Sequence, residues 1–153
     1  MWIVATVSPD AIIGRMTNRS IPSQLGQPIP PETNVIARQI VESALAVHKA
    51  LGPGLLESIY QACLAHELSK RGLTVQQQVL LPVHYDGLTL DAGLRLDLLV
   101  NDAVIVELKA VEQVLPVHRA QVLTYLKLTG HRLALLINFN VVLIKHGIER
   151  IAL

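Results

Sequence analysis

Two aliphatic runs joined by a short polar segment constrain the fold of this chain more than any other feature. Apart from one acidic residue in each, residues 96–100 and 104–108 are all Leu, Val or Ile, and Asn101 and Asp102 lie between the runs. Such runs, bounded by turn-forming residues, are typical of buried strands. Together with a hairpin turn at Asp86-Gly87, they predict three consecutive antiparallel strands. These strands are expected at residues 73–85, 88–100 and 103–111.

The flanking segments have the apolar spacing of amphipathic helices. A first helix is expected to begin near Asn34, capped by Thr33 or Asn34, and to end before Gly52-Pro53-Gly54. The remaining expected elements are helices at residues 55–71 and 117–128 and strands at residues 132–138 and 141–146. The residues expected to form the buried stripe of the second helix are Leu56, Ile59, Tyr60, Cys63, Leu64 and Leu68. This order predicts one α/β domain with a central mixed β-sheet flanked by helices.

Composition limits the class of protein. Of the 153 residues, 51% are hydrophobic and 16% charged, the net charge is +1, and there is one cysteine. These values exclude a wholly disordered chain and a disulfide-linked scaffold. No apolar run reaches the roughly 20 residues of a membrane span, so we expect a soluble cytoplasmic protein without a membrane partner. Residues 1–33 hold five of the eight prolines and are expected to form an irregular arm before a domain at residues 34–153.

Asp97 and Glu107 are the two carboxylates that interrupt the aliphatic runs. A carboxylate in such surroundings is costly unless it is paired or binds a metal ion. A two-residue turn at Asn101-Asp102 would put the two side chains on opposite faces of the sheet. A three-residue turn that includes Ala103 would place them opposite each other, with Cβ atoms roughly 5 Å apart. We predict the second register.

Two carboxylates at that separation suit one hard divalent cation. Mg²⁺ takes oxygen ligands and keeps several waters, and Mn²⁺ is the alternative ion. Lys109 shares a strand face with Glu107, where it could position an attacking water, and the backbone carbonyl of Leu108 could complete the ligand set. The residues therefore predict a metal site that acts on a phosphate ester.

These residues and several further motifs resemble a known family. Asp97 followed by Glu107-Leu108-Lys109 matches the acidic and E-x-K elements of the PD-(D/E)XK nuclease superfamily. Residues 54–60, GLLESIY, are similar to the signature of its GxxExxY family. Gln121 and Tyr125 match the QxxxY motif of RecB-like nucleases. The resemblance continues through residues 136–139 and 147–150 and covers about residues 34–153.

The resemblance implies a single restriction-endonuclease-like domain and a Mg²⁺-dependent nuclease that hydrolyses phosphodiester bonds of DNA or, as a second expectation, RNA. It makes Asp97 and Glu107 metal ligands and Lys109 the catalytic lysine. It adds Glu57 near the metal. It also implies that Gln121 and Tyr125, four residues apart on one helical face, contact the substrate or orient the lysine.

Each of these residues also has a purely structural interpretation. Asp97 could form an ion pair with Arg95 or Lys109, and Glu57 could simply favour the first turn of its helix. Gln121 and Tyr125 could pack as ordinary helix residues, and Tyr60 is expected in the core. A nuclease fold does not by itself carry nuclease activity. The alternative function is therefore a catalytically silent module that binds nucleic acid or protein.

Overall fold

The computed structural model describes residues 26–153. Two helices, α2 (Pro31–Leu51) and α3 (Glu57–Lys70), come first and are followed by three strands, β1 (Val75–Tyr85), β2 (Leu88–Val100) and β3 (Val104–Lys109). Helix α4 (Pro116–Thr129) then leads into β4 (Leu133–Asn138), a short 3-10 helix η2 (Ile144–His146) and the last strand β5 (Ile148–Ala152). No helix within residues 26–153 is long and apolar enough to cross a membrane.

The five strands form one mixed sheet in the order β1-β2-β3-β4-β5. Strand β2 runs antiparallel to both β1 and β3, β3 and β4 are parallel, and β5 is antiparallel to β4. The parallel pair is connected through α4, as parallel neighbours require a crossover. The fold is therefore the α/β domain with a central mixed sheet that the sequence predicts.

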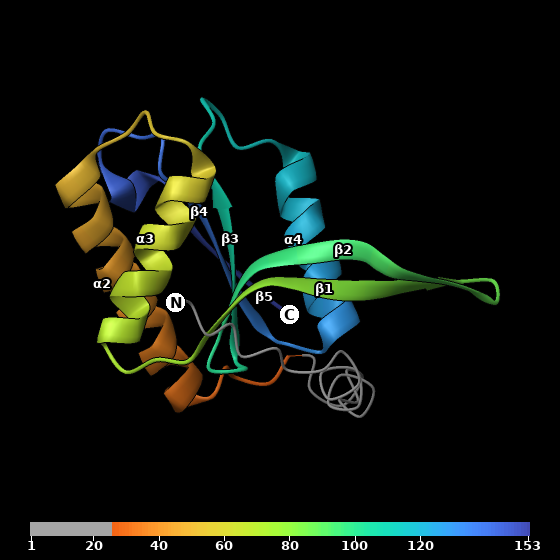
Figure 1. The fold of residues 1–153 in the computed structure, drawn as a ribbon. Coiled ribbons are helices and arrows are strands. Elements are labelled where there is room, and N and C mark those ends of the chain that lie inside the picture. The colour runs from red at the N-terminus through yellow and green to blue at the C-terminus, as the bar shows by residue number, and fades with distance from the viewer. Residues whose placement is uncertain (1–25) are drawn as a thin grey trace, which may run out of the picture.

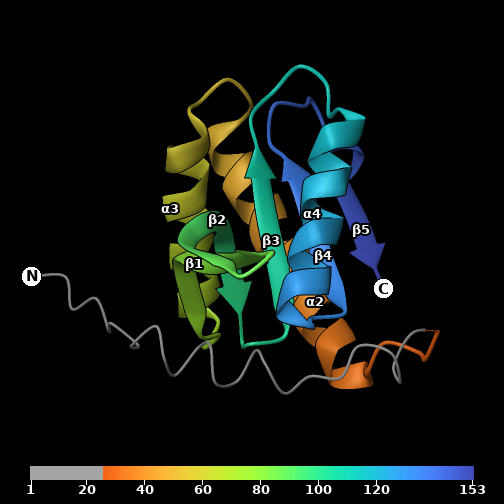
Figure 2. The ribbon, with the colours of Figure 1, turned by 90° about the vertical axis from the view of Figure 1, so that its right-hand side faces the viewer.

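The helices cover the two faces of the sheet unequally. Figure 1 shows α2 and α3 against one face and α4 against the other, and Figure 2 looks onto the sheet from the α4 side. Each layer has its own apolar cluster. The larger one joins α2 and α3 to alternate residues of β3 and β4, and the smaller one joins α4 to β1, β2 and the other residues of β3 and β4.

Several local expectations need correction. The last strand does not lie at residues 141–146. That segment is a loop ending in η2, with the Val142 side chain 86% exposed, and β5 follows it. The first helix begins at Pro31, and neither Thr33 nor Asn34 caps it, since the N-cap position is Pro30. Leu56, the residue before α3, is 71% exposed and Ile59 in α3 is 40% exposed, so the buried stripe of this helix is narrower than expected.

The expected irregular arm falls mostly on residues 1–25, which lie outside the described residues. The described chain that precedes α2 is anchored to the domain. Arg132 donates hydrogen bonds to the backbone carbonyls of Gln27 and Pro28 and to that of Leu153 near the end of β5.

Candidate active site

The site forms where β2 and β3 separate. The two strands pair in the register that places Val100 opposite Val104, which confirms the three-residue turn. The pairing of β2 with β3 covers residues 98–100 of β2, so it stops at Leu98, next to Asp97. From there the Asp97 carboxylate reaches across to β3, and its Oδ2 accepts a hydrogen bond of 2.8 Å from the backbone amide of Leu108. Beyond the paired residues, the Asp97 side chain thus accepts the hydrogen bond that a backbone carbonyl of β2 would accept in a regular strand pair. Asp97 lies beside Glu107, as expected.

Glu107 is buried in the middle of the site, only 3% exposed. Its Oε1 accepts a hydrogen bond of 3.0 Å from Nζ of Lys109 on the same face of β3, while its Oε2 is buried and has no hydrogen-bond partner. Burial and the neighbouring Asp97 raise the pKa of Glu107 to about 7, although Lys109 acts in the opposite direction. The lysine is therefore bound to Glu107, and not to Asp97 as the structural interpretation of Asp97 allowed.

Glu57, the first residue of α3, faces the same pair of strands. Burial and the Asp97 charge raise its pKa, and Lys109, the Ala110 backbone amide and His118 oppose that rise. These influences come from groups near Glu57, among them Asp97 and Lys109, and a role of Glu57 at a metal ion stays a prediction. Glu57 differs from Glu107 in being only partly buried.

The loop before Glu57 is held by Tyr60. This tyrosine is fully buried, donates a hydrogen bond of 2.5 Å to the Gly52 carbonyl and accepts one of 3.2 Å from the Leu55 amide. Its ring stacks on Phe139 with centroids 4.5 Å apart. Gly54 has a φ of +100°, a conformation that favours glycine. The glycine and tyrosine of the GxxExxY pattern therefore have a structural role here, because they form a tight loop that fixes the start of α3.

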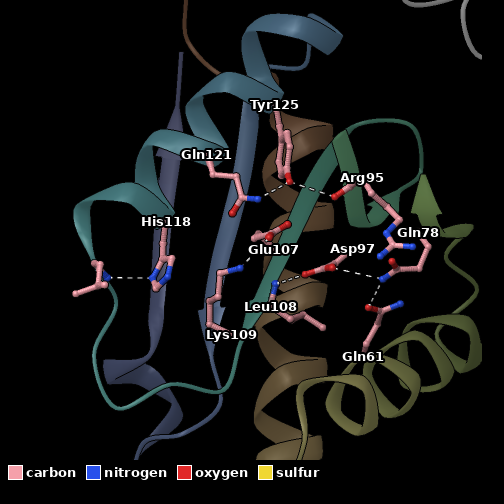
Figure 3. Close-up of polar contacts among 11 residues, drawn as sticks. Gln61, Gln78, Arg95, Asp97, Glu107, Leu108, Lys109, His118, Gln121 and Tyr125 are labelled. Carbon is pink, nitrogen blue, oxygen red and sulfur yellow. Dashed lines mark hydrogen bonds and ion pairs between the residues drawn. The ribbon is translucent and has the colours of Figure 1, made fainter. Parts of the chain in front are cut away.

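Gln121 and Tyr125 line the opposite side of the site, on α4 (Figure 3). Nε2 of Gln121 donates a hydrogen bond of 2.7 Å to the Tyr125 hydroxyl, which in turn donates one of 3.2 Å to the Arg95 carbonyl. Burial, followed by the charges of Glu107 and Asp97, raises the pKa of Tyr125 to about 12. The pair thus connects α4 to β2 next to the carboxylates, and Tyr125 is an uncharged donor there.

Hydrogen bonds from the motif at residues 136–139 hold the end of β3, and the motif at residues 147–150 packs against the first motif in turn. The Asn138 side chain makes hydrogen bonds with both the amide and the carbonyl of Val111, and the Phe139 amide bonds the Lys109 carbonyl. The Gly147 carbonyl accepts a hydrogen bond of 2.8 Å from the Asn138 amide. A Cβ on Gly147 would lie 2.0 Å from the Asn138 carbonyl oxygen, so no side chain fits there.

Two glutamines belong to the site but were not predicted. Nε2 of Gln78 on β1 lies 3.4 Å from Oδ1 of Asp97 and 2.6 Å from Oε1 of Gln61 on α3 (Figure 3). Gln61 follows Glu57 by four residues, so the two share a helix face. That spacing, and the run of three glutamines at residues 76–78 in an otherwise apolar strand, were the available signals.

The oxygen atoms at this site fit a hard divalent cation better than a softer one. Among residues 26–153, no three His, Cys, Asp or Glu side chains are arranged as a ready metal-binding group. The buried Oε2 of Glu107, which lacks a partner, is nevertheless a costly feature that a cation would satisfy. Mg²⁺ commonly uses one or two carboxylates and fills its other positions with water, so Asp97 and Glu107 are a sufficient protein contribution.

Comparison with known proteins identifies the family. Searches of curated proteins and of solved structures gave no significant match. A family model described as the PD-(D/E)XK nuclease superfamily matches residues 34–151. The match spans most of the domain, including both strands that carry the carboxylates and the helix that carries Gln121 and Tyr125. This chain belongs to the PD-(D/E)XK nuclease superfamily.

Proposed function

We propose that this protein is a Mg²⁺-dependent nuclease that hydrolyses phosphodiester bonds, with DNA as the substrate. One observation carries the proposal. Glu107 is a buried carboxylate with one oxygen that has no partner, and it lies beside Asp97 and a lysine. A carboxylate kept in this state is destabilising for the fold alone, so its retention points to a cation as its missing partner.

The chain's own residues would divide the work as follows. Asp97, held by the Leu108 amide, and Glu107 would hold the cation, and Glu57 would act at its edge. A divalent cation supplies neutralisation of the phosphate charge and lowers the pKa of a water molecule. Lys109, whose Nζ lies 3.0 Å from Glu107 Oε1, would orient the attacking water and offset negative charge on the phosphate.

Gln121 and Tyr125 would contact the substrate or orient Lys109 from the α4 side. Because the Tyr125 pKa is about 12, its hydroxyl stays protonated at neutral pH and can act only as a hydrogen-bonding group. The hydrogen bond from Gln121 fixes the orientation of that hydroxyl. Both residues would therefore contribute binding and orientation, while the carboxylates and Lys109 carry the chemistry.

Within the superfamily, we propose that the chain is a member of the GxxExxY family, on the strength of residues 54–60 and the role of Tyr60 in fixing their loop. The cytoplasmic location expected from composition stays a prediction. The alternative function, a silent module that binds nucleic acid or protein, keeps the same fold but has no need of the buried carboxylate pair.

The test is cleavage of single- and double-stranded DNA and of RNA with Mg²⁺ or Mn²⁺. The wild type should cleave DNA, and Asp97→Ala and Lys109→Ala should each lose at least 100-fold in rate. Arg119→Ala is a suitable control because Arg119 forms an exposed pair with Glu149 outside the site. DNA binding without cleavage would support the silent module, and equal cleavage by all variants would place the activity elsewhere.

A further inference from the structure

Gln78 has a backbone conformation that is unusual for a strand residue. Its φ is +53°, in the left-handed region, although it lies within β1. The other non-glycine residues with positive φ in residues 26–153 are Asp86, Asn101 and Asp102, and all three lie in turns. A residue with a long side chain is strained in this conformation, and such strain often marks a position that serves function.

The unusual backbone is found at the point where β1 passes Asp97. The ladder pairs Gln77 with Leu98 and Val79 with Leu96, so Gln78 lies opposite Asp97 without a pair of its own. Its side chain is exposed and extends toward Asp97 and Gln61 (Figure 3). The carboxamide of Gln78 therefore meets the Asp97 carboxylate across the β1–β2 pair, at the residue of β1 whose backbone is distorted.

The hydrogen bonds of Gln78 connect two parts of the site. Its Nε2 can donate one hydrogen to Oε1 of Gln61, at 2.6 Å, and the other to Oδ1 of Asp97, at 3.4 Å. The longer contact is weak as it stands, but contacts of this kind commonly tighten when the full complex forms. Since Leu108 already holds Oδ2, a donor at Oδ1 fixes the plane of the carboxylate.

Gln61 extends this connection to α3. It is one turn after Glu57, so any movement of the start of α3 moves both side chains together. Gln61 also donates a hydrogen bond of 3.4 Å to Oε1 of Gln77, which keeps its own carbonyl oxygen directed to Gln78. The network thus runs from the Glu57 face of α3 through two carboxamides to the Asp97 carboxylate on β2.

We propose that Gln78 is a positioning residue that orients the Asp97 carboxylate for the divalent cation and sets its distance from Glu57. This inference rests on the proposed function. The positive φ of Gln78 occurs at the position where this side chain meets Asp97, and backbone strain of this kind is often found at functional positions. Partners that orient a metal-binding carboxylate commonly affect metal affinity or activity by 10- to 100-fold when removed.

Gln78→Gly tests the inference because relief of backbone strain should preserve or raise stability, whereas loss of the carboxamide should lower metal affinity and activity. Glycine adopts a positive φ without penalty, so the melting temperature in EDTA should stay level or rise by roughly 2 °C. Loss of the carboxamide should nevertheless weaken Mn²⁺ binding, measured by calorimetry, and lower kcat on DNA, each by about 10-fold. Asp86→Gly relieves another positive φ in the distant β1–β2 turn, and should leave Mn²⁺ affinity and kcat unchanged.

The role of Gln61 provides a second variant. If Gln61 acts through Gln78, the double variant Gln61→Ala with Gln78→Gly should bind Mn²⁺ as Gln78→Gly does, with no further loss. Unchanged Mn²⁺ affinity and kcat in Gln78→Gly, in a wild type that binds and cleaves, would overturn this inference alone. Absence of Mn²⁺ binding by the wild type would overturn the proposed function and this inference with it.

Discussion

Replacing Glu107 with glutamine should make the metal-free protein more stable at alkaline pH. The carboxyl pKa rises from its ordinary 4.5 to about 7 in the folded state. The folded protein therefore binds this proton more tightly than the unfolded chain does. The stability that depends on this proton is fully present below pH 4.5 and is lost as the pH rises through 7. The shift corresponds to about 3 kcal/mol.

Glu107→Gln cannot lose this contribution, because the amide does not ionise. The effect of Lys109 on the ionised carboxylate is already contained in the pKa of Glu107, so it adds no separate dependence on pH. The decisive quantity is therefore the difference in free energy of unfolding between variant and wild type, measured by urea denaturation in EDTA. We expect it to change in favour of the variant by about 3 kcal/mol between pH 4.5 and pH 8.

A divalent cation should act in the opposite direction and favour the wild type. A ligand that binds only the folded state at 100 times its Kd adds about 2.7 kcal/mol of stability, and the wild type should gain this while Glu107→Gln should not. Glu42→Gln is the matched control, since Glu42 forms an exposed pair with Arg71 outside the site. A difference in unfolding free energy that does not vary with pH would refute the reasoning, as would equal stabilisation of both proteins by the cation.

Three further predictions concern the supports of the site. Tyr60→Phe removes the hydroxyl that joins Gly52 to Leu55, so chemical denaturation should show a loss of about 1–2 kcal/mol, and cleavage should slow because the loop before Glu57 loosens; full activity would contradict this role. Gly147→Ala forces a Cβ against the Asn138 carbonyl and should cost about 2–3 kcal/mol in the same assay, whereas Gly72→Ala meets only an unfavourable φ in open space and should cost about 1 kcal/mol. Because the Tyr125 pKa is about 12, the difference in absorbance at 295 nm between wild type and Tyr125→Phe should show no titration below pH 11; a midpoint near 10 would show that this phenol is not held as described.

The central strands and the carboxylate pair could be predicted because the relevant constraints are local. The length of the turn after Val100 decides which face Asp97 occupies, and only one of two registers brings Asp97 beside Glu107. The carboxylates are recognisable because their neighbours are so uniformly aliphatic. Burial of Glu107 then follows from its strand, which has helices on both faces.

The predicted position of the last strand was wrong because it relied on the β propensity of residues 141–146, whereas tertiary contacts decide where this strand forms. Residues 141–144 are Val, Val, Leu and Ile, which favours a strand. The close approach of Gly147 to the Asn138 backbone instead makes residues 139–147 a connection, and Ile148 becomes the first partner of β4 in β5. Neither contact can be inferred from local pattern, because both depend on how β4 ends.

The glutamine network was missed for a related reason. Gln78 lies opposite Asp97 because of how β1 and β2 pair, and neither that pairing nor the positive φ of Gln78 can be read from the local sequence pattern. Gln61 could have been noticed from its spacing to Glu57, but its partner lies on a strand 17 residues further along the chain. Contacts that depend on one irregular residue are therefore the part of the site that sequence patterns predict least well.

The most direct test of the central claim is the rate at which purified wild type and Asp97→Ala convert a labelled DNA strand to shorter products, with Mg²⁺ and with EDTA. The account predicts cleavage by the wild type in Mg²⁺, none in EDTA, and loss of at least 100-fold in Asp97→Ala. Cleavage that persists in EDTA, or that Asp97→Ala retains in full, would contradict it.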